Sequence, residues 1–125
     1  MVTVNMSGIA TTVVAAHNIA KTMKSGDLEV FATPAMCALM EEAAKCAVAP
    51  ALAEGEGTVG TRLSITHDAP SGLGKTIEAK AVVTAVDGRK ITFDVEAYEG
   101  DTCIGKGIHE RFIINNDKFM SKVHR

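Results

Sequence analysis

Residues 31–44 read FATPAMCALMEEAA, and this stretch decides how the chain folds. Thr33 is a residue type that is favoured as a helix N-cap, and Pro34 is favoured at the first helical position. We therefore expect a helix from about residue 34 to residue 49. Apolar side chains occupy nearly its whole circumference, which is typical of a buried helix. Within it stands Glu41, a carboxylate that is costly to bury unless it is paired or takes part in chemistry.

The two adjacent carboxylates of this helix have different expected surroundings. Glu42 lies three residues before Lys45 and can pair with it at the surface, so we expect Glu41 to be the inward one. The hydroxyl of Thr33 has two interpretations. It is a plain helix cap, or it also lies at the positive end of the helix dipole, where an oxyanion is stabilised. Thr33 and Glu41 are roughly 12 Å apart along the helix axis, so a substrate that reaches both would lie along the helix.

Composition limits the class of protein. The chain has 125 residues and a net charge of −2, so we expect a single domain over residues 1–125. The cations are scattered rather than gathered in a stripe, which argues against nucleic acid as a partner. No apolar run reaches the ~20 residues of a membrane span, and the N-terminus has no secretion signal, so we expect a cytoplasmic protein without a membrane partner. The three cysteines are expected to be reduced.

After residue 50 the apolar pattern changes to a period of two, which is typical of strands. Asp87-Gly88 is a strong hairpin signal between two such segments. Residues 18–23 are expected as a short helical turn, and the tail after residue 117 as a short helix. The expected strands are residues 8–16, 59–67, 77–85, 91–97 and 102–114.

Alternation along residues 59–67 predicts which side chains face the helix. The predicted inward set is Val59, Thr61, Leu63, Ile65 and His67. The predicted outward set is Gly60, Arg62, Ser64 and Thr66. An inward histidine at this place is either a hydrogen-bonded core residue or a catalyst, and the pattern alone leaves both open.

The order of elements predicts the architecture. One strand is followed by a buried helix and then by four long antiparallel strands, and a sheet of that size must wrap something to bury its apolar face. The apolar helix is the candidate. We therefore expect an α+β protein with the hot-dog fold, a curved antiparallel sheet wrapped around one long central helix.

Several motifs are absent or have a plain explanation. Gly55, Gly57 and Gly60 match a dinucleotide fingerprint as a string, but that fingerprint needs a strand before it and a helix after it, and here the order is reversed. No histidine has a partner at metal-ligand spacing, so no metal is expected. No Gly-x-Ser-x-Gly nucleophile elbow occurs. The polar groups left for chemistry are the hydroxyl of Thr33, the carboxylate of Glu41 and the imidazole of His67.

At these residues the chain resembles the fluoroacetyl-CoA thioesterase family of the hot-dog thioesterase superfamily. The resemblance spans about residues 28–114, and the spacings between Thr33, Glu41 and His67 match the catalytic triad of the family without a gap. The matching segments are Phe31-Ala32-Thr33, Met40-Glu41, Gly55-Glu56-Gly57, Gly60-Thr61, Thr66-His67, Gly88-Arg89 and Gly107-Ile108-His109-Glu110-Arg111.

The resemblance implies an acyl-CoA thioester hydrolase that needs no cofactor, with coenzyme A as part of the substrate. Thr33 would hold or polarise the acyl group, Glu41 would act as nucleophile or general base, and His67 would assist the leaving thiolate or water. The implied substrate-binding residues are Phe31, Gly60 and Arg111. The family also implies a homodimer whose sheets join edge to edge, with active sites near the interface, and leaves further association of dimers open.

One departure from the family concerns selectivity. Members specific for the fluorinated acyl group have phenylalanines that gate the pocket before the Phe-Ala-Thr segment, whereas residues 24–27 read KSGD. We therefore expect a general short-chain acyl-CoA thioesterase. The alternative is a non-catalytic module that binds or senses acyl-CoA on the same fold. A hydratase is not favoured because its Asp-x-Asn-Pro-x-His type of segment does not occur here.

Overall fold

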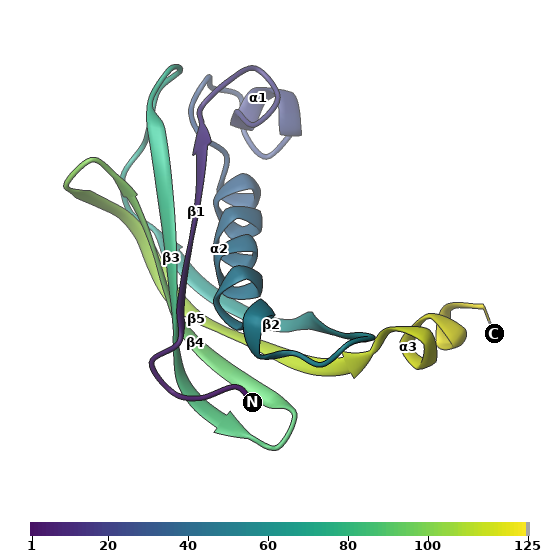
Figure 1. Cartoon of the computed structure of the whole chain (residues 1–125). Coiled ribbons are helices and arrows are strands. Elements are labelled where there is room, and N and C mark those ends of the chain that lie inside the picture. Colours follow the sequence, from purple (N-terminus) through teal and green to yellow (C-terminus); the bar gives the residue numbers. More distant parts are fainter. Residues whose placement is uncertain (125) are drawn as a thin grey trace.

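In the computed structural model, which describes residues 1–124, an antiparallel sheet curves around one long helix (Figure 1). The strand order is β1-β3-β4-β5-β2, and every neighbouring pair is antiparallel. This confirms the predicted strand, helix and four-strand order. The elements are β1 (Ser7–Val13), α1 (Ala20–Met23), α2 (Thr33–Val48), the 3-10 turn η1 (Ala49–Ala51), β2 (Glu56–His67), β3 (Thr76–Asp87), β4 (Lys90–Glu99), β5 (Thr102–Asn115) and α3 (Asn116–Val123).

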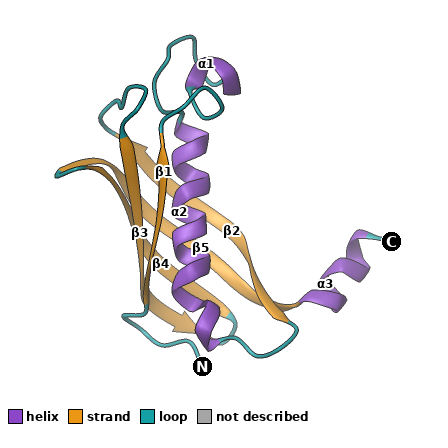
Figure 2. Cartoon of the chain, turned by 45° about the horizontal axis from the view of Figure 1, so that its top comes forward, coloured by secondary structure: helices purple, strands orange, loops and turns teal. Residues whose placement is uncertain are grey.

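The core lies between α2 and the concave face of the sheet (Figure 2). The predicted period of two is confirmed in β3 and β4, because every second side chain there is buried. The alternation stops at Ala85, which is exposed because a bulge between Val83 and Ala85 shifts the register. The buried residues of β3 and β4 are Ile77, Ala79, Ala81, Val83, Ile91, Phe93, Val95 and Ala97.

Strand β1 passes in contact with the backbone of α2. A Cβ atom added to Gly8 would lie 2.4 Å from the carbonyl oxygen of Ala43 and 2.5 Å from the amide nitrogen of Ala47. Both alanines are buried, and their small side chains permit this approach. Small residues on both elements therefore replace the large aromatic side chains that the chain lacks.

The predicted start of the central helix is wrong by one residue. Ala32 is the N-cap, Thr33 is the first helical residue, and no side chain caps the helix. The hydroxyl of Thr33 bonds the imidazole of His67 instead. The first strand also ends earlier than predicted, at Val13, because the amide of Asn18 bonds the Val13 carbonyl and the Ala15 N–H and so turns the chain.

A bulge in β2 corrects the predicted faces of that strand. The register with β5 shifts between Gly60 and Arg62, so Thr61 is the extra residue and is exposed. Gly60, predicted to face outward, instead faces α2, since a Cβ on it would lie 2.8 Å from the Oε2 atom of Glu41. Leu63, Ile65 and His67 lie beyond the bulge and are the more buried residues there, as predicted.

The two edge strands of the sheet are β1 and β2. Strand β2 is an edge strand with β5 on one side and no strand of residues 1–124 on the other. The short tail helix is confirmed as α3, which leaves the body of the molecule after β5 (Figure 1) and has Asn115 as its side-chain cap.

All three cysteines are free. Among residues 1–124, no helix is long and apolar enough to cross a membrane.

The contact between β1 and α2 leads to a stability prediction. We expect Gly8→Ala to lower the free energy of unfolding by about 1–3 kcal/mol, because the added methyl group must push the helix backbone away. Urea denaturation measures this. The matched control is Gly72→Ala, where an added Cβ meets nothing within 4 Å. Equal stability of the two variants would contradict the tight contact.

Candidate active site

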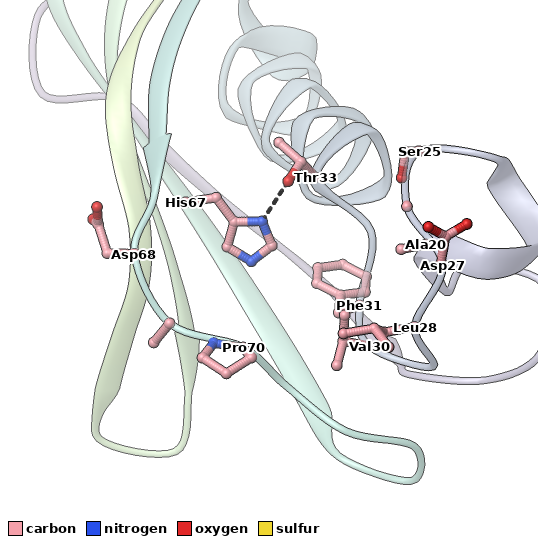
Figure 3. A pocket seen from close by; sticks show the side chains of 12 residues that line it. Ala20, Ser25, Asp27, Leu28, Val30, Phe31, Thr33, His67, Asp68 and Pro70 are labelled. Carbon is pink, nitrogen blue, oxygen red and sulfur yellow. Dashed lines mark hydrogen bonds between the residues drawn. The ribbon is translucent and has the colours of Figure 1, made fainter.

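A threonine and a histidine meet at the first turn of α2. The Oγ1 atom of Thr33 lies 2.7 Å from Nδ1 of His67, within hydrogen-bond distance (Figure 3). Thr33 begins α2 and His67 ends β2, so the contact joins residues 34 positions apart. The hydrogen bond also explains why the hydroxyl of Thr33 does not cap the helix.

This pair borders a hollow of about 390 Å³. The aromatic ring of Phe31, which is 1% exposed, forms part of its wall beside Thr33 (Figure 3). Its rim is made by the segment between α1 and α2, including Ser25 and Asp27, and by the turn after β2. The lining residues are Ala20, Ser25, Gly26, Asp27, Leu28, Val30, Phe31, Thr33, His67, Asp68, Ala69 and Pro70.

The environment of His67 favours its neutral form. Burial lowers the pKa of its imidazole below the usual 6.5, while the charge of Asp68 and the backbone of Ala69 oppose the shift. The Nε2 atom of this ring is buried and has no hydrogen-bond partner among residues 1–124. When the proton of the neutral ring is on Nε2, the Thr33 hydroxyl donates to Nδ1 and the Nε2–H has no acceptor among residues 1–124.

Glu41 lies beside a second hollow of about 540 Å³, further along α2. Its side chain is 44% exposed and faces Gly60, whereas Glu42 is exposed. Glu41 is thus the more inward carboxylate, as predicted, although it is only half-buried. The lining residues are Ala38, Glu41, Glu42, Lys45, Cys46, Thr58, Val59, Gly60 and Arg111.

Arg111 is the cation nearest to this carboxylate. Its Nε donates to Oγ1 of Thr58 at 2.9 Å and its Nη2 to the Thr58 carbonyl at 2.9 Å, which fixes the guanidinium on the inner face of the sheet. Its Nη1 lies 4.0 Å from Oε2 of Glu41 and 3.2 Å from Nε2 of His109. Burial lowers the pKa of Arg111, and the charge of Glu41 opposes this.

The six residues predicted for the site fall into two groups. Phe31, Thr33 and His67 line the first hollow, and Glu41, Gly60 and Arg111 line the second. No hydrogen bond within residues 1–124 joins the Glu41 carboxylate to Thr33 or His67. His109, which contacts Arg111, was not among the residues predicted for the site. Its signal was its position two residues before Arg111 on one strand, which places both on the same face.

Comparison with known proteins places this fold and these residues in a class. The curved sheet around one helix is shared with a hot-dog-like protein from Thermanaerovibrio acidaminovorans (22% identity, TM-score 0.85, covering 96% of this chain and 89% of that one), a likeness of fold alone. The model of the family described as fluoroacetyl-CoA-specific thioesterase matches residues 14–117. The chain belongs to that family, within the hot-dog thioesterase superfamily.

Individual relatives agree with this placement. The chain is 43% identical over 97 residues to the fluoroacetyl-CoA thioesterase of Streptantibioticus cattleyicolor, covering 78% of this chain and 70% of the relative. A solved structure of a fluoroacetyl-CoA thioesterase has a TM-score of 0.92 at 35% identity and covers 99% of this chain and 96% of that one. A thioesterase superfamily member from Thermus thermophilus has a TM-score of 0.92 at 27% identity, covering 100% and 93%.

Burial of His109 and partial burial of His67 lead to a prediction on pH and stability. In the unfolded chain a histidine has a pKa near 6.5, and burial lowers the pKa of both His67 and His109 in the fold. Below pH 6.5 the unfolded chain therefore binds more protons, and the free energy of unfolding falls as the pH falls. We expect the urea midpoint to drop between about pH 7.5 and about pH 5.5, and to drop less in His109→Gln.

The control for this measurement is Ile104→Val, a core change on the same strand that removes no titratable group. It should lower stability by a similar amount at both pH values. The same pH dependence in wild type and His109→Gln would contradict the prediction.

Proposed function

We propose that this chain hydrolyses a short-chain acyl-CoA thioester to the free acid and coenzyme A, without a cofactor. The observation that carries the proposal is the Thr33–His67 hydrogen bond beside a hollow at the first turn of α2, in a member of a thioesterase family. A relative of 35% identity, a variant of the fluoroacetyl-CoA thioesterase, has been solved in complex with acetyl-CoA. We also propose that the chain forms a single domain and works in the cytoplasm.

The first turn of α2 would receive the thioester carbonyl. Helix N–H groups there have no intrahelical partners, and with no side-chain cap they can receive negative charge that develops on the carbonyl oxygen. The Thr33 hydroxyl would hold or polarise the acyl group. As water adds and the C–S bond breaks, His67 would assist the leaving thiolate by donating a hydrogen bond from its Nε2–H. Phe31 would pack against the acyl group.

Glu41 would be the nucleophile or the base that activates water. The geometry of the helix limits how it does so. Eight residues of helix place Glu41 roughly 12 Å from Thr33, whereas reacting atoms must approach within about 3–3.5 Å. We therefore propose a homodimer in which the β2 edges pair. Two-fold symmetry then sets the two α2 helices antiparallel, so that Glu41 of one copy approaches Thr33 and His67 of the other. Gly60 and Arg111 would support Glu41 and the substrate.

The chemistry is tested by free-thiol release from a panel of acyl-CoA thioesters, short to long and including fluoroacetyl-CoA. We expect hydrolysis by wild type, fastest with short acyl groups, and a loss of at least about 100-fold in kcat in Glu41→Gln, because the amide is neither base nor nucleophile. The control variant is Glu42→Gln, which changes the exposed neighbour. Binding of acyl-CoA without any hydrolysis would instead support the sensing module.

The shared site is tested by mixing two inactive variants. Glu41→Gln and His67→Ala, unfolded together and refolded, should form heterodimers in which one of the two sites has every wild-type group. Random pairing then returns about one quarter of wild-type activity. Each variant refolded alone is the control. Heterodimers that form but stay inactive would show that each site belongs to one chain.

A further inference from the structure

His109 has a place in the structure that none of the proposed roles uses. It lies on β5 with 1% of its surface exposed, and its ring stacks on Phe93 with 5.9 Å between centroids. A buried polar side chain is costly unless its nitrogen atoms are paired. Both nitrogens of His109 do have partners, and these partners determine where its proton is.

The partners of the ring allow one tautomer. Nδ1 lies 2.8 Å from the carbonyl oxygen of Arg62, which only accepts, so Nδ1 carries the proton. Nε2 of the neutral ring is then an acceptor, and it lies 3.2 Å from Nη1 of Arg111, which only donates. Burial lowers the pKa of His109 and the charge of Arg111 lowers it further, whereas the Arg62 carbonyl, Glu41 and Glu110 oppose the shift.

The contact between His109 and Arg111 is also one of the hydrogen bonds that hold the guanidinium. Thr58 accepts hydrogen bonds from Nε and Nη2 of Arg111. Nε2 of His109 accepts one from Nη1, the nitrogen that faces Glu41. The guanidinium is thus bound on three sides by groups of β2 and β5, and its remaining direction is toward the carboxylate. The Arg111 side chain is 8% exposed and that of Glu41 is 44% exposed, so solvent screens their attraction in part and the position of the guanidinium decides how strongly it acts.

We propose that His109 is a positioning residue for Glu41: its neutral imidazole, set by the Arg62 carbonyl, holds Nη1 of Arg111 beside the carboxylate. Without the Nε2 acceptor, the guanidinium can turn away and leave Glu41 without its fixed cation. The inference rests on the proposed role of Glu41. It assigns His109 no contact with substrate.

The test compares two substitutions of His109 in the full chain. His109→Phe keeps a ring against Phe93 but removes both polar contacts, whereas His109→Gln offers one donor and one acceptor. With the short-chain acyl-CoA that wild type hydrolyses fastest, we expect His109→Phe to lower kcat by about ten- to a hundredfold, the size of a lost hydrogen bond to a charged group. KM should change less than kcat, since His109 itself does not contact the substrate. His109→Gln should recover most of the lost kcat.

Two further comparisons separate positioning from stability. Ile104→Val, a buried apolar change on the same strand, should keep the wild-type kcat. In a Glu41→Gln background, His109→Phe should cause no further loss, because it acts through the carboxylate. If His109→Phe is recovered unfolded, His109→Leu takes its place, and the Gln rescue is judged against it.

The outcomes distinguish this inference from the proposed function. Three results would overturn the role of His109. They are a wild-type kcat in His109→Phe, an equal loss of kcat in His109→Phe and His109→Gln, or the same loss of kcat when His109→Phe is added to Glu41→Gln. Wild-type turnover in Glu41→Gln itself would overturn the role of Glu41 and, with it, the basis of the inference.

Discussion

The close packing of α2 on the sheet is the constraint on which the rest of the structure depends. With four phenylalanines and no tryptophan, the chain cannot fill a wide space between helix and sheet with large rings. It brings the backbones together instead, with Gly8 against Ala43 and Ala47. A helix held this tightly cannot slide or turn, because each shift would bring backbone atoms into overlap. The first turn of α2 and the backbone of Glu41 are therefore held in place on the sheet.

The polar groups around α2 are arranged by charge. The half of the helix that carries Glu41 faces a buried guanidinium, and the first turn offers N–H groups and a neutral histidine. Negative charge is thus favoured at both places for different reasons. Beside Glu41 the reason is the full charge of the guanidinium, and at the first turn it is the helix dipole. A single helix organises both, although in one chain they border separate hollows.

Much of the fold could be predicted from the sequence, because a period of two in the strands and one largely apolar helix leave few ways to bury the apolar surface. Thr33, Glu41 and His67 could be selected because few polar groups fall on inward faces. The bulge at Thr61 could not be predicted, since an extra residue in a strand leaves no mark in a short alternating pattern. The helix start was misplaced because Thr33 bonds a residue from a distant strand. His109 was missed because its value depends on Arg62 and Arg111 around it.

The wall of the hollow beside Thr33 has a consequence for how this protein can change over generations. Ser25, Gly26, Asp27 and Leu28 are exposed residues of a connecting segment, and none belongs to the hydrophobic core. Surface substitutions of this kind alter stability little. The rim of the hollow that is proposed to receive the acyl group can therefore vary while the helix and the proposed catalytic groups stay in place. Divergence in acyl preference is open to this scaffold through a few tolerated replacements, whereas divergence in chemistry would require rebuilding its core.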